Sequence, residues 1–470
     1  MHLHEIAQAL NATSIGDDVA IGEIVTDTRK LSPGCLFVAL KGPRYDGHDF
    51  AATALQRGAA AVMVAASANL TLSPALVVED TLLALGRLAA WHRDRMPAKI
   101  AAITGSNGKT TVKEMLAAIL AAETGAAGVL STEGNLNNDI GMPLTLLRLG
   151  REHRYAAIEM GMNHAGELAY LTNIARPDVA LVNNALRAHL EGLGSVEAVA
   201  RAKGEIYAGL GENGIAIINA DDAHAELLRE LAGNHPVLRF GYSDNADVRI
   251  LPGDQFALAT PAGRIEAALH VPGQHNLRNA AAAASLALAL NIPAASIARG
   301  LSAYSGVKGR LQIHACILGA TLIDDTYNAN PDSVLAAIQV LAARPGRRIL
   351  VLGDMGELGA DAAALHREVG ERARDAGIER LLCLGELTLH TVAAFGPGGM
   401  HFERIEELLA EIECALAPDV SVLVKGSRFM QMERVVKSFQ ETVCTPHASL
   451  PPEGADCPPE GGLSEGKTCS

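Results

Sequence analysis

The chain has 470 residues, which is enough for about three domains that each bury a core of their own. Hydrophobic residues make up 49% and charged residues 20%, as in an ordinary globular enzyme, and the low aromatic content of 3% leaves the cores to Ala, Leu, Val and Ile. A formal net charge of −14 argues against a protein that coats nucleic acid or an anionic membrane, so we expect no nucleic-acid partner.

Targeting signals are the next feature to consider. The N-terminus lacks a basic segment followed by an apolar run, and no stretch is long and apolar enough to span a membrane. The seven cysteines are scattered without CxxC pairs, which fits reduced thiols better than a disulfide framework. We therefore expect a cytoplasmic protein without membrane insertion.

Residues 1–96 are predicted to form a small α/β domain. Short apolar runs at 35–40, 60–64 and 75–78 are separated by helical segments such as 50–58.

From residue 99 the pattern becomes strand, Gly-rich turn and helix, repeated. Four runs are apolar on both faces: 100–104, 156–160, 179–182 and 215–219. Continuous apolar strands between helices are typical of a parallel sheet that is covered on both sides. We therefore predict a central, doubly wound domain over residues 97–307.

A third set of alternating strands and helices predicts a second doubly wound, Rossmann-like domain over residues 308–443. Its strands are expected at 321–323, 348–352, 380–384 and 420–424. The Gly-containing segment 305–309 is the expected hinge between this domain and the central one. Residues 444–470 are rich in Pro, Gly and acids, which predicts a disordered tail.

The strongest chemical signal is TGSNGKTT at residues 104–111, between an apolar strand and a helix. Such a turn can bind a triphosphate through its backbone N–H groups and the helix N-terminus. Lys109 would lie along the β- and γ-phosphates, and Thr110 would offer its hydroxyl to Mg²⁺. The generic P-loop has Gly where this chain has Ile103, but a mere surface turn is disfavoured by GKTT at this place. The residues predicted to bind ATP or GTP here are Gly105, Ser106, Asn107, Gly108, Lys109, Thr110 and Thr111.

Nucleotide binding leaves the reaction open between an NTPase switch and a transferase or ligase. Glu159 ends an apolar strand, where ligands of open α/β sheets bind, and is placed to reach a metal. His189 follows the next strand by a short loop, and Lys203 lies in a helical stretch beside Glu205. On spacing alone, His189 is more often a loop or core residue than a ligand, and Lys203 more often a surface residue.

These residues occur in an order that resembles the Mur ligases, and the resemblance covers roughly residues 3–440. It is carried by the short P-loop, by EMG at 159–161, by the 183–191 segment and by AKGEI at 202–206. The resemblance implies that Thr110 and Glu159 hold a Mg²⁺ ion on the ATP phosphates and that His189 binds a second Mg²⁺. It also implies that Lys203 is carbamylated. With Lys109 and Arg310, His189 and Lys203 are the expected catalytic residues.

The same resemblance places the rest of the nucleotide site. Asn276 and Asn279, in QHNLRNA at 274–280, are implied on the adenine side. Arg310 and Asp325 are implied as the phosphate and ribose contacts of the third domain as it closes over ATP.

Three segments are similar to the family member that adds D-alanyl-D-alanine: GNLNNDIGMP at 134–143, DDTYNANPDS at 324–333, and LGDMGELG at 352–359 followed by LHREVG. The DNPR segment of the diaminopimelate-adding member is absent, and DTR at 27–29 and DGH at 46–48 resemble the family's UDP-sugar-binding face. Lys425 and Ser427 are the expected grip on the substrate carboxylate, against the alternative of a turn with exposed cations. The expected substrate-binding residues are Thr28, Arg29, Lys41, Asp46, Gly47, His48, Asn138, Asn328, Asn330, Lys425 and Ser427.

The resemblance thus implies a monomeric ATP-dependent ligase of peptidoglycan precursor synthesis. ATP would convert the carboxylate of UDP-MurNAc-tripeptide into an acyl phosphate, which the amine of D-Ala-D-Ala then attacks. Another Mur-type ligase or a folylpolyglutamate synthase is the alternative within the class, although the latter normally lacks the first domain. A P-loop switch is the alternative outside it. Whether the third peptide residue is lysine or diaminopimelate stays open.

Overall fold

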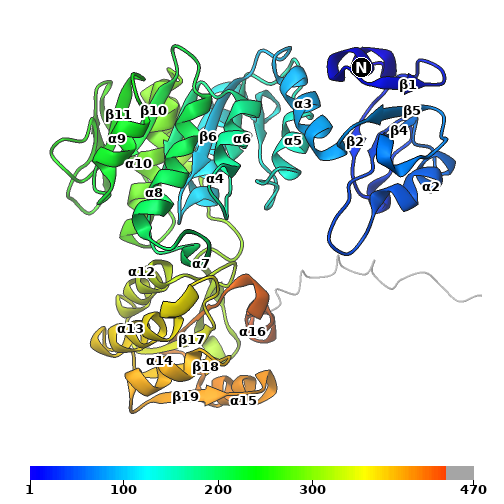
Figure 1. The fold of residues 1–470 in the computed structure, drawn as a ribbon. Coiled ribbons are helices and arrows are strands. Elements are labelled where there is room, and N and C mark those ends of the chain that lie inside the picture. Colours follow the sequence, from blue (N-terminus) through cyan, green and yellow to red (C-terminus); the bar gives the residue numbers. More distant parts are fainter. Residues whose placement is uncertain (441–470) are drawn as a thin grey trace, which may run out of the picture.

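The structure is a computed structural model that describes residues 1–440. It contains three β-sheets, one after another along the chain, each packed against its own helices (Figure 1). The predicted tail at 444–470 lies outside the described residues. Within residues 1–440, no helix has the length and apolar character needed to cross a membrane.

The first sheet has five strands in the order β1-β5-β4-β3-β2, and only β1 runs antiparallel to its neighbour. Its strands are β1 (Thr13–Ile15), β2 (Ile24–Val25), β3 (Leu36–Val38), β4 (Ala61–Ala65) and β5 (Ala75–Val78), and its helices are α1 (Leu3–Leu10), α2 (Ala51–Gln56) and α3 (Thr81–Arg93). The side chain of Asp80 starts α3 by accepting hydrogen bonds from the backbone N–H groups of Leu82 and Leu83. Because α3 packs on α5 (Gly141–Leu146) and α6 (Glu167–Ala175) of the central domain, it joins the two domains.

The central sheet has nine strands in the order β14-β13-β12-β11-β10-β9-β6-β8-β7. The strands are β6 (Lys99–Thr104), β7 (Val129–Ser131), β8 (Tyr155–Glu159), β9 (Val179–Val182), β10 (Ile215–Asn219), β11 (Val237–Gly241), β12 (Val248–Ile250), β13 (Phe256–Thr260) and β14 (Gly263–Ala267). The helices are α4 (Lys109–Thr124), α5 (Gly141–Leu146), α6 (Glu167–Ala175), α7 (Leu190–Leu193), α8 (Val196–Gly204), α9 (Ala225–Leu231), α10 (Gln274–Ala289) and α11 (Ala294–Ala303). The strands from β7 to β12 are parallel, as predicted, but β13 and β14 add an antiparallel edge that the sequence patterns did not reveal.

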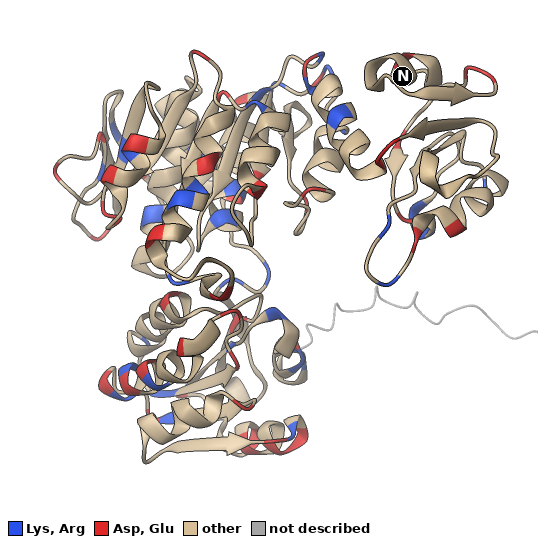
Figure 2. Ribbon diagram, in the orientation of Figure 1, with Lys and Arg blue, Asp and Glu red and all other residues tan. Residues whose placement is uncertain are grey.

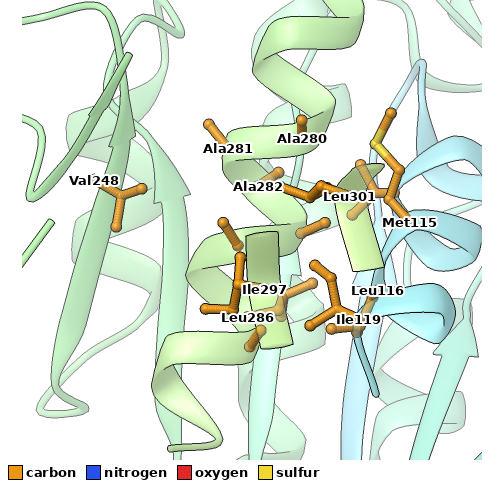
Figure 3. Close-up of a cluster of buried hydrophobic side chains, with 14 of the residues drawn as sticks. Met115, Leu116, Ile119, Val248, Ala280, Ala281, Ala282, Leu286, Ile297 and Leu301 are labelled. Carbon is orange, nitrogen blue, oxygen red and sulfur yellow. The ribbon is translucent and has the colours of Figure 1, made fainter. Parts of the chain in front are cut away.

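One face of the central sheet is covered by α4, α10 and α11, which approach one another closely through small side chains (Figure 3). Ala280, Ala281 and Ala282 lie fully buried on α10. At Gly300 of α11, a Cβ atom would lie 2.3 Å from the Cα of Ile119, so the absence of a side chain lets α11 pack directly on α4. The core of this domain, which has few aromatic side chains, is thus filled by helices that pack closely through small residues.

The third sheet has six strands in the order β15-β16-β20-β17-β18-β19, and all but β15 are parallel. The strands are β15 (Gln312–Ala315), β16 (Thr321–Asp325), β17 (Arg347–Gly353), β18 (Arg380–Leu384), β19 (Gly399–Phe402) and β20 (Val420–Lys425), and the helices are α12 (Pro331–Ala342), α13 (Ala362–Asp375), α14 (Thr388–Phe395), α15 (Ile405–Ala415) and α16 (Glu433–Phe439). Separate hydrophobic clusters lie on its two faces, so this domain has a core of its own. The predicted α/β architecture with three domains is confirmed.

Candidate active site

A cavity of about 1150 Å³ lies between the central and third domains. Its walls come from the loops that follow β6, β8, β9 and β10 and from the loops that follow β16, β17 and β20. The carboxyl ends of strands in both parallel sheets therefore open into the same space, which is where open α/β sheets bind ligands.

The phosphate loop runs from the end of β6 to the start of α4. Gly108 precedes the helix with a φ of 81°, and a Cβ atom there would lie 2.4 Å from Oδ1 of Asn279, so only glycine fits. No side chain caps α4, which leaves the first N–H groups of the helix available to an anion. Asn184 holds the loop from the other side, because its Oδ1 accepts from the backbone N–H of Asn107 at 2.8 Å.

Three predicted residues meet at this loop. The Thr110 hydroxyl donates to Oε2 of Glu159 at 2.9 Å, and the amide of Asn137 donates to the other carboxylate oxygen at 2.8 Å. The ammonium of Lys109 donates to the Gly105 carbonyl at 2.7 Å. Burial lowers the pKa of Lys109, and the nearby charge of Glu159 opposes that shift.

Arg310 reaches the same place from the third domain. Its Nη2 lies 3.3 Å from Oγ1 of Thr110, and its guanidinium stacks 4.1 Å from the centre of the Tyr327 ring. Its Nε is buried without a hydrogen-bond partner among the described residues. A cation from one domain is thus directed at the phosphate loop of the other.

Lys203 is buried at the end of α8, with 1% of its surface exposed, so its default interpretation as a surface residue was wrong. Within residues 1–440 its amine makes no hydrogen bond or ion pair. Burial, followed by the charge of Lys109, lowers the pKa of Lys203 well below its ordinary value.

His189 lines the cavity with a left-handed backbone, at a φ of 58°. Its Nδ1 lies 2.7 Å from Oε2 of Glu357, a residue of the third domain, and this contact lowers the pKa of Glu357. Within the described chain, no three His, Cys, Asp or Glu side chains converge on one point. A protein-only metal cage is therefore lacking, whereas Mg²⁺ at a nucleotide site needs only one or two protein oxygens beside the phosphates.

Asn276 and Asn279 are buried, and their amides form a chain towards the phosphate loop. Asn183 donates to Oδ1 of Asn279 at 3.0 Å and to the Asn107 carbonyl at 2.9 Å. Asn279 in turn donates to Oδ1 of Asn276 at 3.1 Å. The structure thus places both predicted asparagines where they support the phosphate loop.

At the third-domain wall, Lys425 and Asp325 form a buried ion pair at 2.6 Å. Lys425 also donates to the Asn328 carbonyl at 2.8 Å, and Ser427 donates to the Ala329 carbonyl at 3.1 Å. Lys425 is 3% exposed, so the alternative of a turn with exposed cations is wrong for this residue, whereas Arg428, the other cation of the turn, is exposed as that alternative has it.

Three predicted substrate-binding asparagines line the cavity and also shape its backbone. Asn138 accepts from the N–H of Gly141 at 2.9 Å at the start of α5, and the side chain of Asn328 accepts from its neighbour's N–H. Asn330 caps α12 and donates to Oδ1 of Asn107 across the domain boundary at 2.7 Å.

The predicted residues of the first domain lie apart from this cavity, and none of them lines it. Lys41 and Asp46 face each other in a β-bridge, and His48 Nδ1 lies 2.6 Å from Oδ1 of Asp46. Arg29 is exposed and pairs with Asp27. The first-domain residues that were predicted to bind the substrate, and that lie outside the cavity, are Thr28, Arg29, Lys41, Asp46, Gly47 and His48.

Sequence reasoning missed several residues of the site. Asn137, Asn184, Glu357 and Arg187 all line the cavity, and all lie inside segments that carry the family resemblance. Asn184 contacts the phosphate loop, Arg187 and Glu357 contact the opposite domain, and Asn137 contacts the carboxylate of Glu159. Those contacts are visible only in three dimensions.

Comparison with known proteins agrees with this geometry. Residues 20–122 match the Mur ligase family catalytic domain, residues 103–287 the Mur ligase middle domain, and residues 309–428 the Mur ligase glutamate ligase domain. The UDP-N-acetylmuramoyl-tripeptide--D-alanyl-D-alanine ligase of Escherichia coli is 46% identical, over 93% of this chain and 98% of that protein.

Solved structures are similar over most of their length. MurF from Acinetobacter baumannii superposes with a TM-score of 0.85 at 35% identity, over 93% of this chain and 97% of that one. MurF from Thermotoga maritima, solved in complex with ADP, gives a TM-score of 0.77 at 27% identity, over 88% of this chain and 96% of that one.

The chain belongs to the Mur ligase family, and it is an ATP-dependent amide ligase. Since the similarity to the Escherichia coli ligase spans all three domains, it disfavours the folylpolyglutamate synthase and switch alternatives. Within the family, the chain resembles MurF, the ligase that takes D-alanyl-D-alanine.

Proposed function

We propose that this chain joins D-alanyl-D-alanine to UDP-MurNAc-tripeptide at the expense of ATP, in the synthesis of peptidoglycan precursors. One observation carries the proposal: Arg310 of the third domain lies against Thr110 of the phosphate loop, across a cavity with room for further substrates. A switch that only hydrolyses nucleotide has no need of a second domain with its own cation and a wide cavity at the γ-phosphate.

The reaction takes two steps. The terminal carboxylate oxygen of the tripeptide attacks the γ-phosphorus, the bond to the β-phosphate oxygen breaks, and ADP leaves. The amine of D-Ala-D-Ala then attacks the carbonyl carbon of the acyl phosphate, the C–O bond breaks, inorganic phosphate leaves, and the new amide nitrogen loses a proton. No protein nucleophile is needed, so the protein contributes position and charge.

Lys109 and Arg310 are the cations proposed to offset repulsion between triphosphate and carboxylate. Lys109 has to turn from the Gly105 carbonyl to the phosphates, a change within reach of a flexible side chain. Arg310 is already directed at the loop, and its buried, unpaired Nε can donate to a phosphate oxygen. Closing the cavity keeps water from the acyl phosphate.

Two Mg²⁺ ions complete the proposal, and the residues present fit them in part. Thr110 and Glu159 offer adjacent oxygens at the phosphate loop, which suits an ion whose other ligands are phosphates and water. His189 is proposed for the second ion, and there Glu357 lies close enough to share it. When bound, Mg²⁺ supplies positive charge to the phosphate oxygens.

We further propose that Lys203 is carbamylated. Burial lowers the pKa of Lys203, which increases the share of neutral amine relative to a free lysine, and the neutral amine is the form that adds CO₂. The carbamate would place a negative charge near Lys109 and the proposed metal site, where an ammonium is disfavoured.

The first domain is proposed to hold the UDP-sugar end of the substrate through Thr28, Arg29, Lys41, Asp46, Gly47 and His48. Their position outside the cavity suits a long substrate whose far end is anchored away from the reacting carboxylate. In the third domain, Lys425, Ser427, Asn328, Asn330 and, beside the phosphate loop, Asn138 are proposed contacts of the peptide and dipeptide. Asp325 is proposed for the ribose of ATP.

We also propose that the enzyme acts as a monomer in the cytoplasm, because both walls of the cavity come from one chain and two of the three substrates, ATP and the UDP-sugar peptide, are nucleotides. Gel filtration at assay concentration tests the monomer.

The test is an assay of the product mass with ATP, D-Ala-D-Ala and two UDP-MurNAc-tripeptides, one with lysine and one with diaminopimelate at the third position. We expect a mass increase equal to D-Ala-D-Ala with at least one tripeptide, and ADP release that requires both substrates. L-Ala-L-Ala serves as the matched control. Steady ADP release without either substrate would contradict the proposal and favour a switch.

A further inference from the structure

The loop 183–189 belongs to the central domain but lies between two domains. On one side it is bound to the phosphate loop, since the N–H of Leu186 donates to Ser106 Oγ at 2.9 Å and the N–H of Ser106 donates to the Asn184 carbonyl at 3.0 Å. The loop and the phosphate loop therefore move as one unit. Its other side faces the third domain.

Arg187, near the end of this loop, makes the contacts on that side. Its Nε and Nη2 donate to Oδ1 of Asp332 at 3.1 and 2.6 Å, and its backbone N–H donates to Oδ2 at 2.9 Å. Its Nη1 donates to Oε2 of Glu368 at 2.6 Å. The hydrogen bonds with Asp332, and then with Glu368, raise the pKa of Arg187 above its ordinary value.

The two acids come from separate helices of the third domain. Asp332 lies in the first turn of α12, within the DDTYNANPDS segment, and Glu368 lies in α13, within LHREVG. Both segments stood out in the sequence without any function for these acids. Their place opposite Arg187 supplies one.

We propose that Arg187 is a positioning residue which, with Asp332 and Glu368, latches the third domain onto the phosphate loop and so holds Arg310 at Thr110. The three side chains are one-fifth to two-fifths exposed, at 26%, 21% and 37%. Two guanidinium N–H groups share Oδ1 of Asp332 while the backbone N–H of Arg187 takes Oδ2, and these three contacts fix an orientation that a single lysine contact would not. The inference goes beyond the proposed function, because the latch serves whichever amino acid or peptide the enzyme adds.

The chemistry of the latch suits repeated opening. We expect the contact to break and re-form in each cycle, as substrates and products pass through the gap between the domains. Partly exposed ion pairs are individually weak and are screened by salt, unlike an apolar interface. The latch therefore predicts a closed state that weakens as ionic strength rises.

The third domain offers matched controls. Arg347 pairs with Asp419 at 3.1 Å, and Arg348 pairs with Glu379 at 2.7 Å, but both pairs lie within that domain. Arg187→Lys is therefore compared with Arg347→Lys, and Glu368→Gln with Glu379→Gln. The readouts are the radius of gyration by small-angle X-ray scattering with a non-hydrolysable ATP analogue, Tm, and kcat and KM.

For both latch variants we expect a larger radius of gyration with the analogue, kcat lower by about tenfold or more, and Tm equal to that of its control. A fall of this size follows from a small misplacement of Arg310. In the wild-type protein, added salt should increase the radius of gyration of the analogue complex, and this increase should be smaller in Glu368→Gln.

If the latch variants match their controls in both radius and kcat, the proposal is overturned. A lower kcat at an unchanged radius would overturn it too, since the residue would then act in the chemistry. The scattering measurement needs only the ATP analogue and no amide-bond formation. If the proposed ligase activity were not found, the latch could therefore still be tested by the radius of gyration.

Discussion

Replacing Lys203 with methionine separates a structural lysine from a functional one. Methionine keeps roughly the length of the side chain of this residue, which is 1% exposed, but removes its amine, which makes no hydrogen bond or ion pair with the described residues. Burial disfavours the charged form of Lys203, and this penalty destabilises the folded state at neutral pH, where the unfolded chain keeps the lysine protonated. Removing the amine therefore should leave Tm unchanged or raise it. Removing the proposed carbamate should lower kcat by about 10²–10³-fold, as for other electrostatic groups at reacting centres.

Lys113 is the matched control, since it is equally buried in the same domain but has partners. It donates to the Thr132 carbonyl at 2.6 Å and contacts Glu114. Lys113→Met leaves that buried carbonyl unpaired and should lose about 1–3 kcal/mol of stability. Lys203→Met should not.

The pH dependence of stability gives a second readout for Lys203. With its pKa below the ordinary value of 10.5, an unmodified Lys203 in the folded protein releases its proton before it does in the unfolded chain. The unfolded state then binds more protons, so the free energy of unfolding rises with pH up to about 10.5. Lys203→Met should flatten this rise. Thermal melts across pH, turnover by product mass, and ¹³C NMR after addition of ¹³C-bicarbonate measure the three effects. Wild-type turnover in Lys203→Met, or full activity of enzyme shown to carry no carbamate, would refute the reasoning.

Three further predictions follow from single contacts. Thr110→Val, which removes the hydroxyl that donates to Glu159, should lower kcat by about 10²–10³-fold, whereas Thr110→Ser should retain most activity; equal losses in a steady-state assay would contradict this. Burial lowers the pKa of His275 to about 4. Between pH 6.5 and 4 the unfolded chain therefore binds a proton that the folded chain does not, so the free energy of unfolding should fall by about 1.4 kcal/mol for each unit by which the pH is lowered in this range. Denaturant titrations should show that His275→Gln reduces this slope while exposed His270→Gln does not. Gly300→Ala should cost about 1–3 kcal/mol because its Cβ would meet the α4 backbone, whereas Gly211→Ala, with open space around it, should cost little in the same melts.

The strands of the two large sheets were predictable because buried parallel strands are apolar on both faces. The runs at 179–182, 215–219 and 380–384 coincide with Val179–Val182, Ile215–Asn219 and Arg380–Leu384. In the missed hairpin, β14 (GRIEA) is mostly exposed and lacks a continuous apolar run, whereas β13 (FALAT) has such a run and begins with three buried residues, so β13 was predictable and β14 was not. Short strands such as Ile24–Val25 are set by tertiary pairing more than by local pattern.

The site was predictable where chemistry lies at the end of a strand. Glu159 and Asp325 both end parallel strands, and both line the cavity. Arg187 and Glu357 were not predictable, because their partners come from the other domain and no spacing along the chain reveals how two domains dock. Lys203 shows a third case: its burial depends on how α8 packs, which its local sequence does not display.

The scaffold around the phosphate loop is built largely from asparagines, at Asn107, Asn183, Asn184, Asn279 and Asn330. Carboxamides neither gain nor lose protons over the range in which enzymes are assayed. The shape of the loop itself is therefore insulated from acidity, whereas the proposed latch depends on the carboxylates of Asp332 and Glu368. The acid limb of a pH–rate profile should thus report on the latch and on the ionising groups at the reacting centre, and not on a collapsing phosphate loop.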